Sequence, residues 1–409
     1  MINYNILCIG PHFWSDGPGG DIWRRRHHLM TNLAKRHKVV FIEPAYYSPF
    51  CFLGTIFSFF VKRSSLKKIS ENLWVLRLYN PLPLQETSMR VGIKIVKWFN
   101  DRACLFQIKK VLKYLNLKKN ILLWAYYTPR TVFLLEKLRS DFIVCDVYDK
   151  YTEYATVDNW RKDYISKEEK VIFENSDIIF AVSKSLLNYC QKYNENCYLI
   201  PNGVDEIFFN TDLQNSGIPD DLKSIPKPCI GYVGSIFDKL DYNLLFNVLK
   251  SCKNYSFIFI GPVKLINSNK KKQFNKLKAL SNTFFLGVEE IKQLPKYYKW
   301  LDVCIAPYDT SFHQVSWIDP LKALECMAMG KILITTIECV KNSEIQETLL
   351  KADTEDDFIK AINLVLNSDF SKQTAESIQF AKRNTWPIRV SEIEKIINEY
   401  WMRKNQINV

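Results

Sequence analysis

A chain of 409 residues is too long for one hydrophobic core, since single cores stop growing near about 250–300 residues, so the length predicts two domains. Hydrophobic residues make up 47% of the chain and aromatic residues 14%, which is typical of a globular and somewhat aromatic-rich protein. The 56 basic and 43 acidic side chains give a net charge of +13. This charge favours an anionic partner, although a solvated basic surface explains it equally well.

The cysteines and the N-terminus favour a reducing, cytoplasmic compartment. The eleven cysteines are scattered and form no CxxC pair, which argues against a structural zinc site, and we expect no metal ligands. The first residues, MINYNILCIG, are typical of a buried strand and lack the features of a signal peptide. No stretch reaches the roughly 18 apolar residues of a membrane-spanning helix.

Short apolar runs alternate with helical patterns along the first half of the chain. The runs are rich in β-branched and aromatic residues, and Gly, Pro or Asn ends several of them. This alternation predicts an α/β fold with a parallel, doubly wound sheet. The expected strands are 5–10, 38–44, 73–78, 121–126, 141–149, 177–183 and 197–203, and the expected helices are 21–36, 86–117, 129–139, 161–175 and 184–194.

The loop after the first expected strand, GPHFWSDGPGGDIWRRRHHL (10–29), combines glycines with basic residues. Glycine lets backbone N–H groups approach a ligand, and the N-terminus of the next helix favours negative charge. Arg24, Arg25 and Arg26 point in three directions on a helix, so we expect at most one to face a ligand and the others to reach solvent or anionic lipid. A tight strand–helix turn is the simpler interpretation of the loop.

A second segment, Pro49–Lys68, is unusually apolar. Its first thirteen residues, Pro49–Val61, contain five phenylalanines and almost nothing polar, and basic residues follow. The segment is too short to cross a bilayer and suits a loop or helix lying on an anionic membrane surface. A buried helix is the alternative, and we favour the membrane surface.

A stretch rich in Pro, Asp and Ser separates the two halves. We place the linker at 213–228, between an N-terminal domain of residues 1–212 and a second α/β domain of residues 229–380, and we expect a C-terminal helix at 381–409. The expected strands of the second domain are 229–234, 256–262, 283–287, 303–308 and 331–336, with helices near 241–252, 289–299 and 319–329.

The sharpest motif is IDPLKALECMAMGKILITT (318–336). Proline opens a helix in its first turn, Gly330 ends the helix, and a buried strand follows. Lys322 and Glu325 lie three residues apart, on one face near the N-terminus of this helix. An ammonium there can bind a diphosphate, and a carboxylate one turn later can accept hydrogen bonds from two ribose hydroxyls. The alternative is a surface ion pair between the two side chains.

This motif resembles the nucleotide-sugar signature of GT-B glycosyltransferases, in particular the bacterial exopolysaccharide group with the teichuronic-acid transferases and, more distantly, the xanthan glucuronosyltransferase. IPNGVDEIFF (200–209), CIGYVGSIFDKLDYNLL (229–245) and TWPIRVSEIEKII (385–397) also resemble this family. The resemblance implies two Rossmann-like domains that face each other across a cleft. The donor would bind in the second domain and the acceptor in the first, and the C-terminal helix would cross back to the first domain.

The resemblance also assigns residues to the donor sugar nucleotide. Lys322 would offset the charge of the diphosphate, and Glu325 would hold the ribose. His313 is a further donor candidate, with an ordinary loop residue as the alternative. No cofactor or metal is implied, because helix termini and basic side chains stabilise the leaving diphosphate, and we favour a UDP-sugar over a GDP-sugar. The remaining donor candidates stand at the ends of expected strands: Gly234 and Ser235 beside the diphosphate, and Gly261, Pro262, Leu286 and Gly287 near the base.

The catalytic assignment starts from a departure from the family pattern. Many retaining members carry two glutamates eight positions apart, whereas Trp317 stands eight positions before Glu325. This departure favours an inverting mechanism, which needs a general base in the first domain. We favour Asp149, with Glu153 second; an N-cap or an arginine partner is the alternative role of Asp149. The glycine-rich first loop supplies further candidates: Asp16 and Asp21 as the base, and Gly19, Gly20 and Arg24 near the acceptor.

Two other functions fit parts of the same pattern. A sugar-nucleotide epimerase of this architecture binds the same donor, and a non-enzymatic polyanion-binding protein would account for the charge. The leading hypothesis is a transferase in surface polysaccharide synthesis that acts on a glycan or a polyprenyl-diphosphate-linked sugar at the inner face of the plasma membrane. We expect no nucleic-acid partner, because no recognition motif is present.

Overall fold

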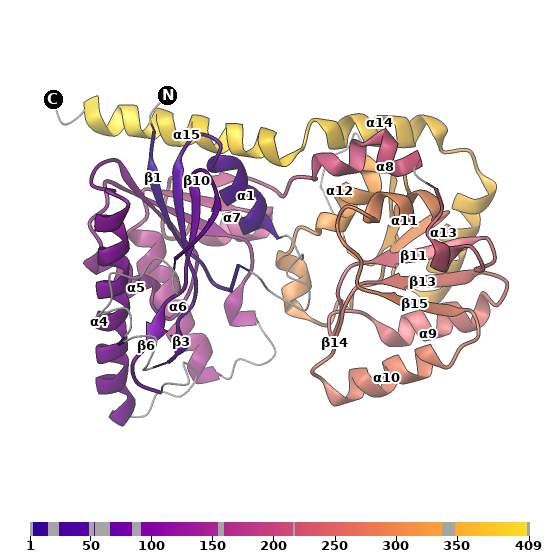
Figure 1. The fold of residues 1–409 in the computed structure, drawn as a ribbon. Coiled ribbons are helices and arrows are strands. Elements are labelled where there is room, and N and C mark those ends of the chain that lie inside the picture. Colours follow the sequence, from indigo (N-terminus) through magenta and orange to yellow (C-terminus); the bar gives the residue numbers. More distant parts are fainter. Residues whose placement is uncertain are drawn as a thin grey trace. The chain divides into compact units, whose positions relative to one another are not determined.

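The chain divides into two compact units. The computed structural model describes residues 3–14, 24–48, 53, 66–83, 91–153, 159–215, 217–337 and 348–406. Unit 1 comprises Met1–Pro201 and Val390–Val409, and unit 2 comprises Asn202–Arg389. Each unit has its own sheet and its own helices (Figure 1).

Unit 1 is built on an eight-stranded sheet of order β10-β9-β8-β7-β1-β2-β5-β4. All neighbours pair in parallel except β4, which pairs antiparallel with β5. The central strands are apolar and buried on both faces, as parallel strands between layers of helices must be. The strands are β1 (Asn5–Ile9), β2 (Lys38–Ile42), β4 (Leu66–Ser70), β5 (Leu73–Leu76), β7 (Ile121–Ala125), β8 (Phe142–Val147), β9 (Ile178–Ala181) and β10 (Cys197–Leu199).

The helices of unit 1 follow these strands along the chain. Two short strands, β3 (Tyr46–Tyr47) and β6 (Tyr79–Asn80), pair with each other outside the main sheet. Strand β4 was not expected, because its polar sequence LKKIS is mostly exposed and carries no apolar alternation. The helices are α1 (Arg25–Leu33), α4 (Val91–Tyr114), α5 (Thr131–Lys137), η1 (Tyr151–Glu153), α6 (Asn159–Glu174) and α7 (Lys184–Cys190).

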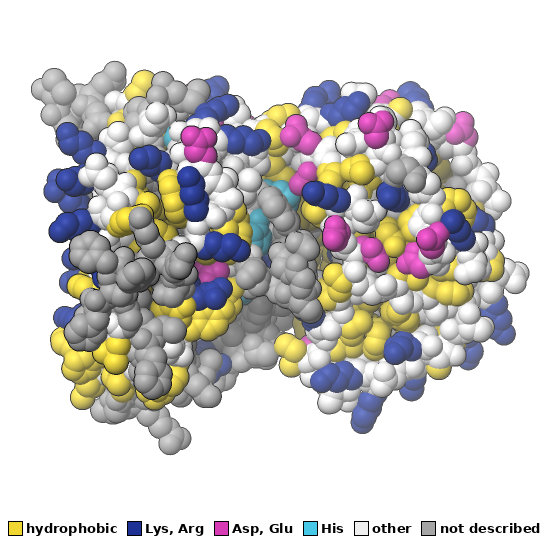
Figure 2. All heavy atoms as spheres, viewed as in Figure 1, with side chains coloured by type: hydrophobic (Ala, Val, Ile, Leu, Met, Phe, Trp, Pro, Cys, Tyr) yellow, Lys and Arg dark blue, Asp and Glu magenta, His cyan; other side chains and the backbone are white. Residues whose placement is uncertain are grey.

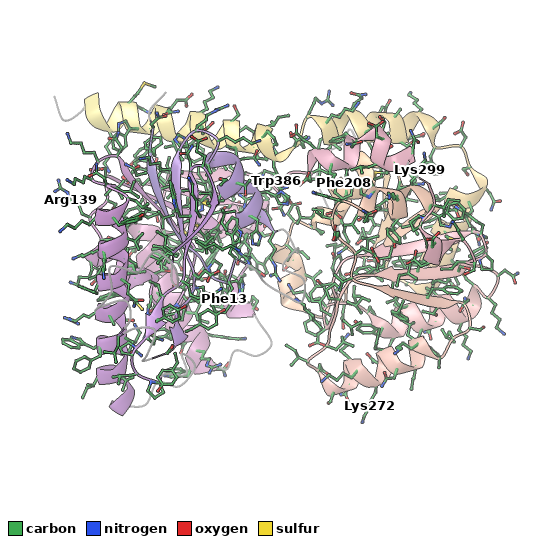
Figure 3. All side chains as sticks on the ribbon, viewed as in Figure 1. Phe13, Arg139, Phe208, Lys272, Lys299 and Trp386 are labelled. Atoms are coloured by element: carbon green, nitrogen blue, oxygen red, sulfur yellow. The ribbon has the colours of Figure 1, made fainter. Side chains whose placement is uncertain are left out.

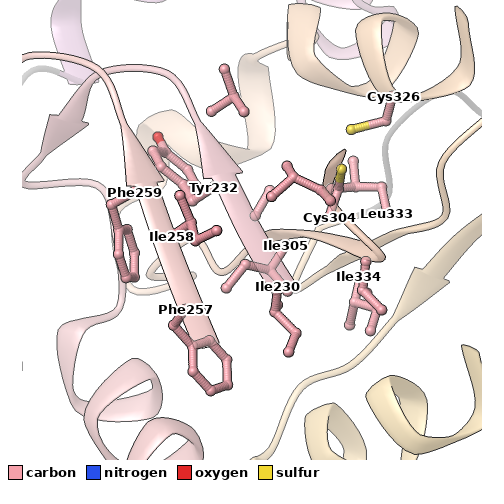
Figure 4. Close-up of a cluster of buried hydrophobic side chains, with 14 of the residues drawn as sticks. Ile230, Tyr232, Phe257, Ile258, Phe259, Cys304, Ile305, Cys326, Leu333 and Ile334 are labelled. Atoms are coloured by element: carbon pink, nitrogen blue, oxygen red, sulfur yellow. The ribbon is translucent and has the colours of Figure 1, made fainter. Parts of the chain in front are cut away.

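Unit 2 is built on a parallel six-stranded sheet of order β15-β13-β11-β16-β17-β18. Its core is a cluster of strand side chains such as Ile230, Phe257 and Ile305, with Cys326 packed above them from a helix (Figure 4). The strands are β11 (Cys229–Val233), β13 (Ser256–Ile260), β15 (Thr283–Gly287), β16 (Val303–Ala306), β17 (Leu333–Thr335) and β18 (Leu349–Lys351), with a separate pair β12 (Ile236–Phe237) and β14 (Val263–Lys264).

The helices of unit 2 include one that the sequence did not reveal, α10, because only Phe274 and Leu277 of its eleven residues are buried. Helix α15 (Trp386–Gln406) supplies residues to both units. The other helical elements are η2 (Glu206–Phe209), α8 (Thr211–Asn215), η3 (Asp220–Leu222), α9 (Tyr242–Ser251), α10 (Ser268–Lys278), α11 (Leu294–Trp300), η4 (His313–Trp317), α12 (Leu321–Ala328), α13 (Glu355–Asn367) and α14 (Ser371–Lys382).

Residues 213–228, where we expect the linker, lie within unit 2. Leu222 and Ile225 in this segment are buried and belong to the core cluster of unit 2. Among the described residues no disulfide joins the cysteines, and eight of the nine described are buried. Burial raises the pKa of several of these thiols, Cys8 and Cys145 among them, so they stay protonated and pack as small apolar side chains.

Candidate functional site

Three glycines lie at the carboxyl ends of three neighbouring strands in unit 2. Gly234 follows β11, Gly261 follows β13 and Gly287 ends β15; their φ angles are +140°, +137° and +86°, which L side chains rarely adopt. A Cβ at Gly261 would lie 2.2 Å from the carbonyl oxygen of Gly234. The Gly261 N–H donates to the Gly287 carbonyl over 2.5 Å. Glycine at these positions therefore lets the chain turn tightly and leaves backbone accessible at this edge of the sheet.

Lys322 reaches over the first of these glycines. Helix α12 begins directly after Pro320, which places Lys322 in its first turn. The Lys322 ammonium donates to the Tyr308 hydroxyl over 3.0 Å and to the Tyr232 hydroxyl over 3.4 Å. A Cβ on Gly234 would lie 3.1 Å from Lys322 Nζ. Two features that are 88 positions apart in the sequence, the glycine turn and the first turn of α12, thus meet in space.

Aromatic side chains surround this ammonium. Lys322 Nζ lies 4.7 Å from the ring centre of Tyr232 and 5.3 Å from that of Tyr308, within the range of cation–π attraction. Burial disfavours the charged form, but the two phenol oxygens and the Glu325 carboxylate outweigh it and raise the pKa of Lys322. The side chain is therefore a cation at neutral pH, and it is held in one place.

Glu325 lies one turn further along α12 and has a different partner. The buried Tyr298 hydroxyl, from α11, donates to Glu325 Oε2 over 2.8 Å. Burial raises the pKa of Glu325, and the hydrogen bond from Tyr298 and the charge of Lys322 oppose the rise. Among the described residues no ion pair within 4.0 Å joins Lys322 to Glu325, so the surface ion pair that we considered does not form.

The loop that precedes α12 is fixed by the PNGVD segment. The Asn202 backbone N–H donates to Asp319 Oδ2 over 2.8 Å, and the Asn202 side-chain amide donates to the Asp319 carbonyl over 2.7 Å. Gly203 packs so closely on the start of α15 that a Cβ there would lie 2.7 Å from the Trp386 backbone nitrogen (Figure 3). The two motifs that carried the resemblance are therefore in direct contact within unit 2.

The remaining donor candidates differ in what surrounds them. The Ser235 carbonyl accepts a hydrogen bond from the Tyr232 hydroxyl over 2.8 Å, and the Pro262 carbonyl accepts one from the Ile236 N–H over 2.9 Å. Leu286 is half-buried in β15, next to exposed Gly287. His313 lies in η4, but its side chain is outside the described part of the chain.

Sequence reasoning missed the three tyrosines of this site. Tyr232 stands inside β11, Tyr308 follows β16, and Tyr298 is buried in α11. A tyrosine inside an apolar run is indistinguishable from a core residue until its hydroxyl is placed. The signal that was available is the position of Tyr232 and Tyr308 near the carboxyl ends of two predicted strands, where ligand sites of parallel sheets lie.

In unit 1, Asp149 lies just beyond the carboxyl end of β8. Its side chain is buried, and its Oδ1 accepts a hydrogen bond from the Lys150 N–H over 3.0 Å. Together with Asp146, Tyr127 and Tyr151 it lines a small cavity. Glu153, the second base candidate, ends η1 and is half-buried.

Lys150 holds the chain directly after Asp149. Its ammonium forms a buried ion pair with Glu169 of α6 over 3.0 Å and lies 3.2 Å from the ring centre of Tyr189. The Tyr189 hydroxyl also donates to Glu169, over 2.9 Å. Burial raises the pKa of Glu169, and both partners oppose the rise. Sequence reasoning missed this cluster, which fixes the backbone beside Asp149.

Two of the three arginines at the start of α1 are buried, which differs from the expectation. Arg25 and Arg26 are both buried, so the expectation that they reach solvent or lipid is wrong. Arg25 forms an ion pair with the Asp146 carboxylate over 2.9 Å, and Arg26 donates to the carbonyl of Phe13 (Figure 3) over 3.0 Å. A buried guanidinium needs such partners, because desolvation without them is costly.

Of the residues expected near the acceptor, only Arg24 lies in the part of the chain that the structure describes. Arg24 is half-buried at the N-terminus of α1, where its backbone N–H donates to His27 Nδ1 over 3.0 Å. Four predicted residues of the first loop lie outside the described residues: Asp16, Gly19, Gly20 and Asp21. In the part of the chain that the structure describes, no group of three or more His, Cys, Asp or Glu residues is arranged to hold a metal ion. No helix in that part is long and apolar enough to span a bilayer.

Known proteins resemble the chain in sequence. Residues 227–368, within unit 2, match the family described as Glycosyl transferases group 1. The chain is 25% identical over 287 residues to TuaH of Bacillus subtilis (strain 168), which is provisionally named as a teichuronic acid biosynthesis glycosyltransferase. This match covers 66% of the chain and 70% of TuaH. The resemblance to glycosyltransferases that the motifs indicated is confirmed.

Solved structures resemble the chain in fold. Sucrose-phosphate synthase from Thermosynechococcus elongatus matches with a TM-score of 0.68 at 16% identity, over 98% of this chain and 100% of that one. An alpha,alpha-trehalose 6-phosphate synthase from Burkholderia multivorans matches with a TM-score of 0.69 at 9% identity, over 100% and 99%. At these identities the likeness shows the fold alone, which is GT-B. Unit 2 thus carries a glycosyl transferases group 1 domain, and the chain is a glycosyltransferase.

Proposed function

We propose that this glycosyltransferase moves a sugar from a nucleoside-diphosphate donor to a hydroxyl of a glycan or lipid-linked sugar in surface polysaccharide synthesis. The donor binds at the carboxyl edge of the sheet in unit 2, and the acceptor binds to unit 1. The name of TuaH, a teichuronic acid biosynthesis glycosyltransferase, supports the polysaccharide assignment. The family match to glycosyl transferases favours this function over the epimerase and the polyanion-binding protein.

The observation that carries the proposal is the position of the Lys322 ammonium over Gly234. Lys322 Nζ would lie 3.1 Å from a Cβ added at Gly234. The ammonium therefore stands directly above a stretch of accessible backbone. A diphosphate placed there meets a fixed positive charge together with the N-terminal end of α12. The same groups stabilise the charge that develops on the diphosphate as it leaves, so the proposal needs no metal ion.

Glu325 is proposed to hold the ribose. Tyr298 occupies Oε2 of its carboxylate, so the orientation of the group is set before the donor binds. The remaining lone pairs can accept hydrogen bonds from two neighbouring hydroxyls. We propose UDP as the nucleotide, with GDP as the comparison in the test.

The proposed mechanism is a single inverting displacement. A carboxylate takes the proton of the acceptor hydroxyl while the hydroxyl oxygen bonds to the anomeric carbon. The bond from that carbon to the diphosphate breaks at the same time, and its electron pair leaves with the diphosphate. Asp149 is our first choice as base, because it stands beyond the end of β8 on a backbone held by Lys150. Glu153, Asp16 and Asp21 are the other candidates for this role.

The test measures nucleotide binding and turnover separately. Calorimetric titration of the full chain with UDP and with GDP should give binding that Lys322→Met weakens by roughly tenfold or more, since a charge-assisted contact is lost. Lys372→Met removes the same charge from an exposed position of α14 and serves as the matched control. Equal affinity in wild type and Lys322→Met would contradict the donor site.

Turnover is followed as release of nucleoside diphosphate with and without a lipid-linked or glycan acceptor. A transferase releases it only with acceptor, and chelation of divalent metals should leave the rate unchanged. Asp149→Asn should abolish turnover and keep nucleotide binding. Normal turnover in this variant would transfer the base assignment to Glu153 or to the first loop.

A further inference from the structure

Helix α4 of unit 1 has two faces of opposite exposure. Its inner face contributes Cys104, Ile108 and Val111 to the core of unit 1. Its outer face carries large apolar side chains that remain exposed: Ile95 (65%), Trp98 (48%), Phe99 (51%) and Phe106 (49%). At 3.6 residues per turn these four fall within an arc of about 100°. Such side chains on one helix face form an apolar patch without a described partner.

The same outer face is basic. Lys94, Arg102, Lys109 and Lys113 are exposed on the same helix, and Arg102 lies between Phe99 and Phe106 in the sequence. The Arg102 guanidinium lies 3.7 Å from the ring centre of Trp98, so a positive charge is in direct contact with an exposed aromatic ring. In Figure 2, Lys and Arg side chains line the upper left edge of unit 1 and hydrophobic ones its lower left, where α4 lies in Figure 1.

No acidic side chain interrupts this face. Asp101 is the single acidic residue of α4, and it is buried. It forms ion pairs with Lys97 over 2.7 Å and with Arg130 over 2.9 Å. The helix thus keeps its one negative charge inside unit 1 and presents only positive charge outside.

The segment that ends at Leu82 packs against the buried side of α4 and carries exposed apolar side chains of its own. Asn100 of α4 exchanges hydrogen bonds with the backbone of Leu82, over 3.2 and 3.1 Å, and Leu82 is itself exposed. Residues just before Leu82 form β6, which pairs with β3, where Tyr46 and Tyr47 are exposed.

We infer that this outer face of α4 docks on an anionic lipid bilayer. Exposed Trp, Phe and Ile side chains on the same helix as exposed Lys and Arg match the apolar and anionic layers of a membrane interface. The described residues of this face carry no acidic group, so an anionic headgroup meets only positive charge and no repulsion there. The inference goes beyond the proposed function and does not depend on it, because a bilayer is bound whether or not sugar is transferred.

Flotation with vesicles tests the inference on the full chain. The wild type should float with vesicles of equal parts phosphatidylcholine and phosphatidylglycerol, and binding should fall as salt rises. Trp98→Ser with Phe99→Ser and Phe106→Ser should lower the bound fraction by roughly tenfold or more. The matched control replaces exposed apolar side chains of unit 2, Val263→Ser with Ile266→Ser and Leu364→Ser, and should bind as the wild type does.

Three results would overturn the inference. First, the wild type does not float. Second, the α4 variant floats as well as the wild type, while a variant with Phe57→Ser, Phe59→Ser and Phe60→Ser does not, which would assign docking to Pro49–Lys68. Third, the wild type is a dimer by sedimentation and the α4 variant a monomer, which would make the face an interface between two copies. Thermal unfolding of the α4 variant reports the fold of unit 1, and calorimetric UDP binding reports the donor site of unit 2 separately from docking.

Discussion

Replacing Tyr298 by phenylalanine removes one oxygen from the buried contact that holds Glu325. The lost hydrogen bond is 2.8 Å long and its acceptor is a carboxylate, for which a net contribution of about 1.5–3 kcal/mol is typical. Tyr298 is 1% exposed, so water cannot replace the hydroxyl from outside. A unit of this size loses about 2–4 °C of Tm per kcal/mol. We therefore expect the unfolding transition of unit 2 to fall by roughly 3–12 °C.

The same variant should bind the nucleotide more weakly, by roughly three- to tenfold, because the Glu325 carboxylate is no longer oriented before the donor binds. Differential scanning calorimetry and titration with UDP give the two values. Tyr255→Phe is the matched control, since Tyr255 donates to Asn363 over 2.7 Å, away from the site and to a neutral acceptor. Wild-type Tm and wild-type affinity in Tyr298→Phe would refute the reasoning that this contact orients Glu325.

Three further outcomes are expected. Gly261→Ala should destabilise unit 2 by about 1–3 kcal/mol or more, because φ is +137° and the new Cβ would lie 2.2 Å from the Gly234 carbonyl oxygen. Urea denaturation measures the change in the free energy of unfolding. A denaturation midpoint equal to that of the wild type would contradict the close approach. Burial, and secondarily the neighbouring His27, lower the pKa of His28 to about 3, so the unfolded state binds the extra proton. Stability tied to His28 is thus complete above pH 6.5 and is lost as the pH falls towards 3, and the dependence of Tm on pH should flatten in His28→Asn. Arg25→Leu should cost about 3–5 kcal/mol by leaving Asp146 buried without its guanidinium, and Arg25→Leu with Asp146→Leu should recover most of the loss in the same denaturation assay.

The sequence was sufficient where the signal is local. Apolar runs ended by Gly or Pro located most strands of both sheets, and the Pro320 start with Lys322 and Glu325 on one face is a property of a single helix. It failed where a strand carries no apolar alternation, as in β4, or where a helix buries two residues, as in α10. It also failed at Arg25, whose charge predicted exposure before its partner was known.

The sequence by itself therefore determined the alternation of strands and helices, the glycine turns at strand ends and the spacing of the lysine and the glutamate, because each depends on neighbours within a few residues. Only the tertiary structure decided which groups surround them. Tyr298 meets Glu325, and Arg25 meets Asp146, across 27 and 121 positions of the chain. The physical reason is that such pairs arise from the order of strands and the packing of helices upon them, and helical or strand periodicity carries no record of either.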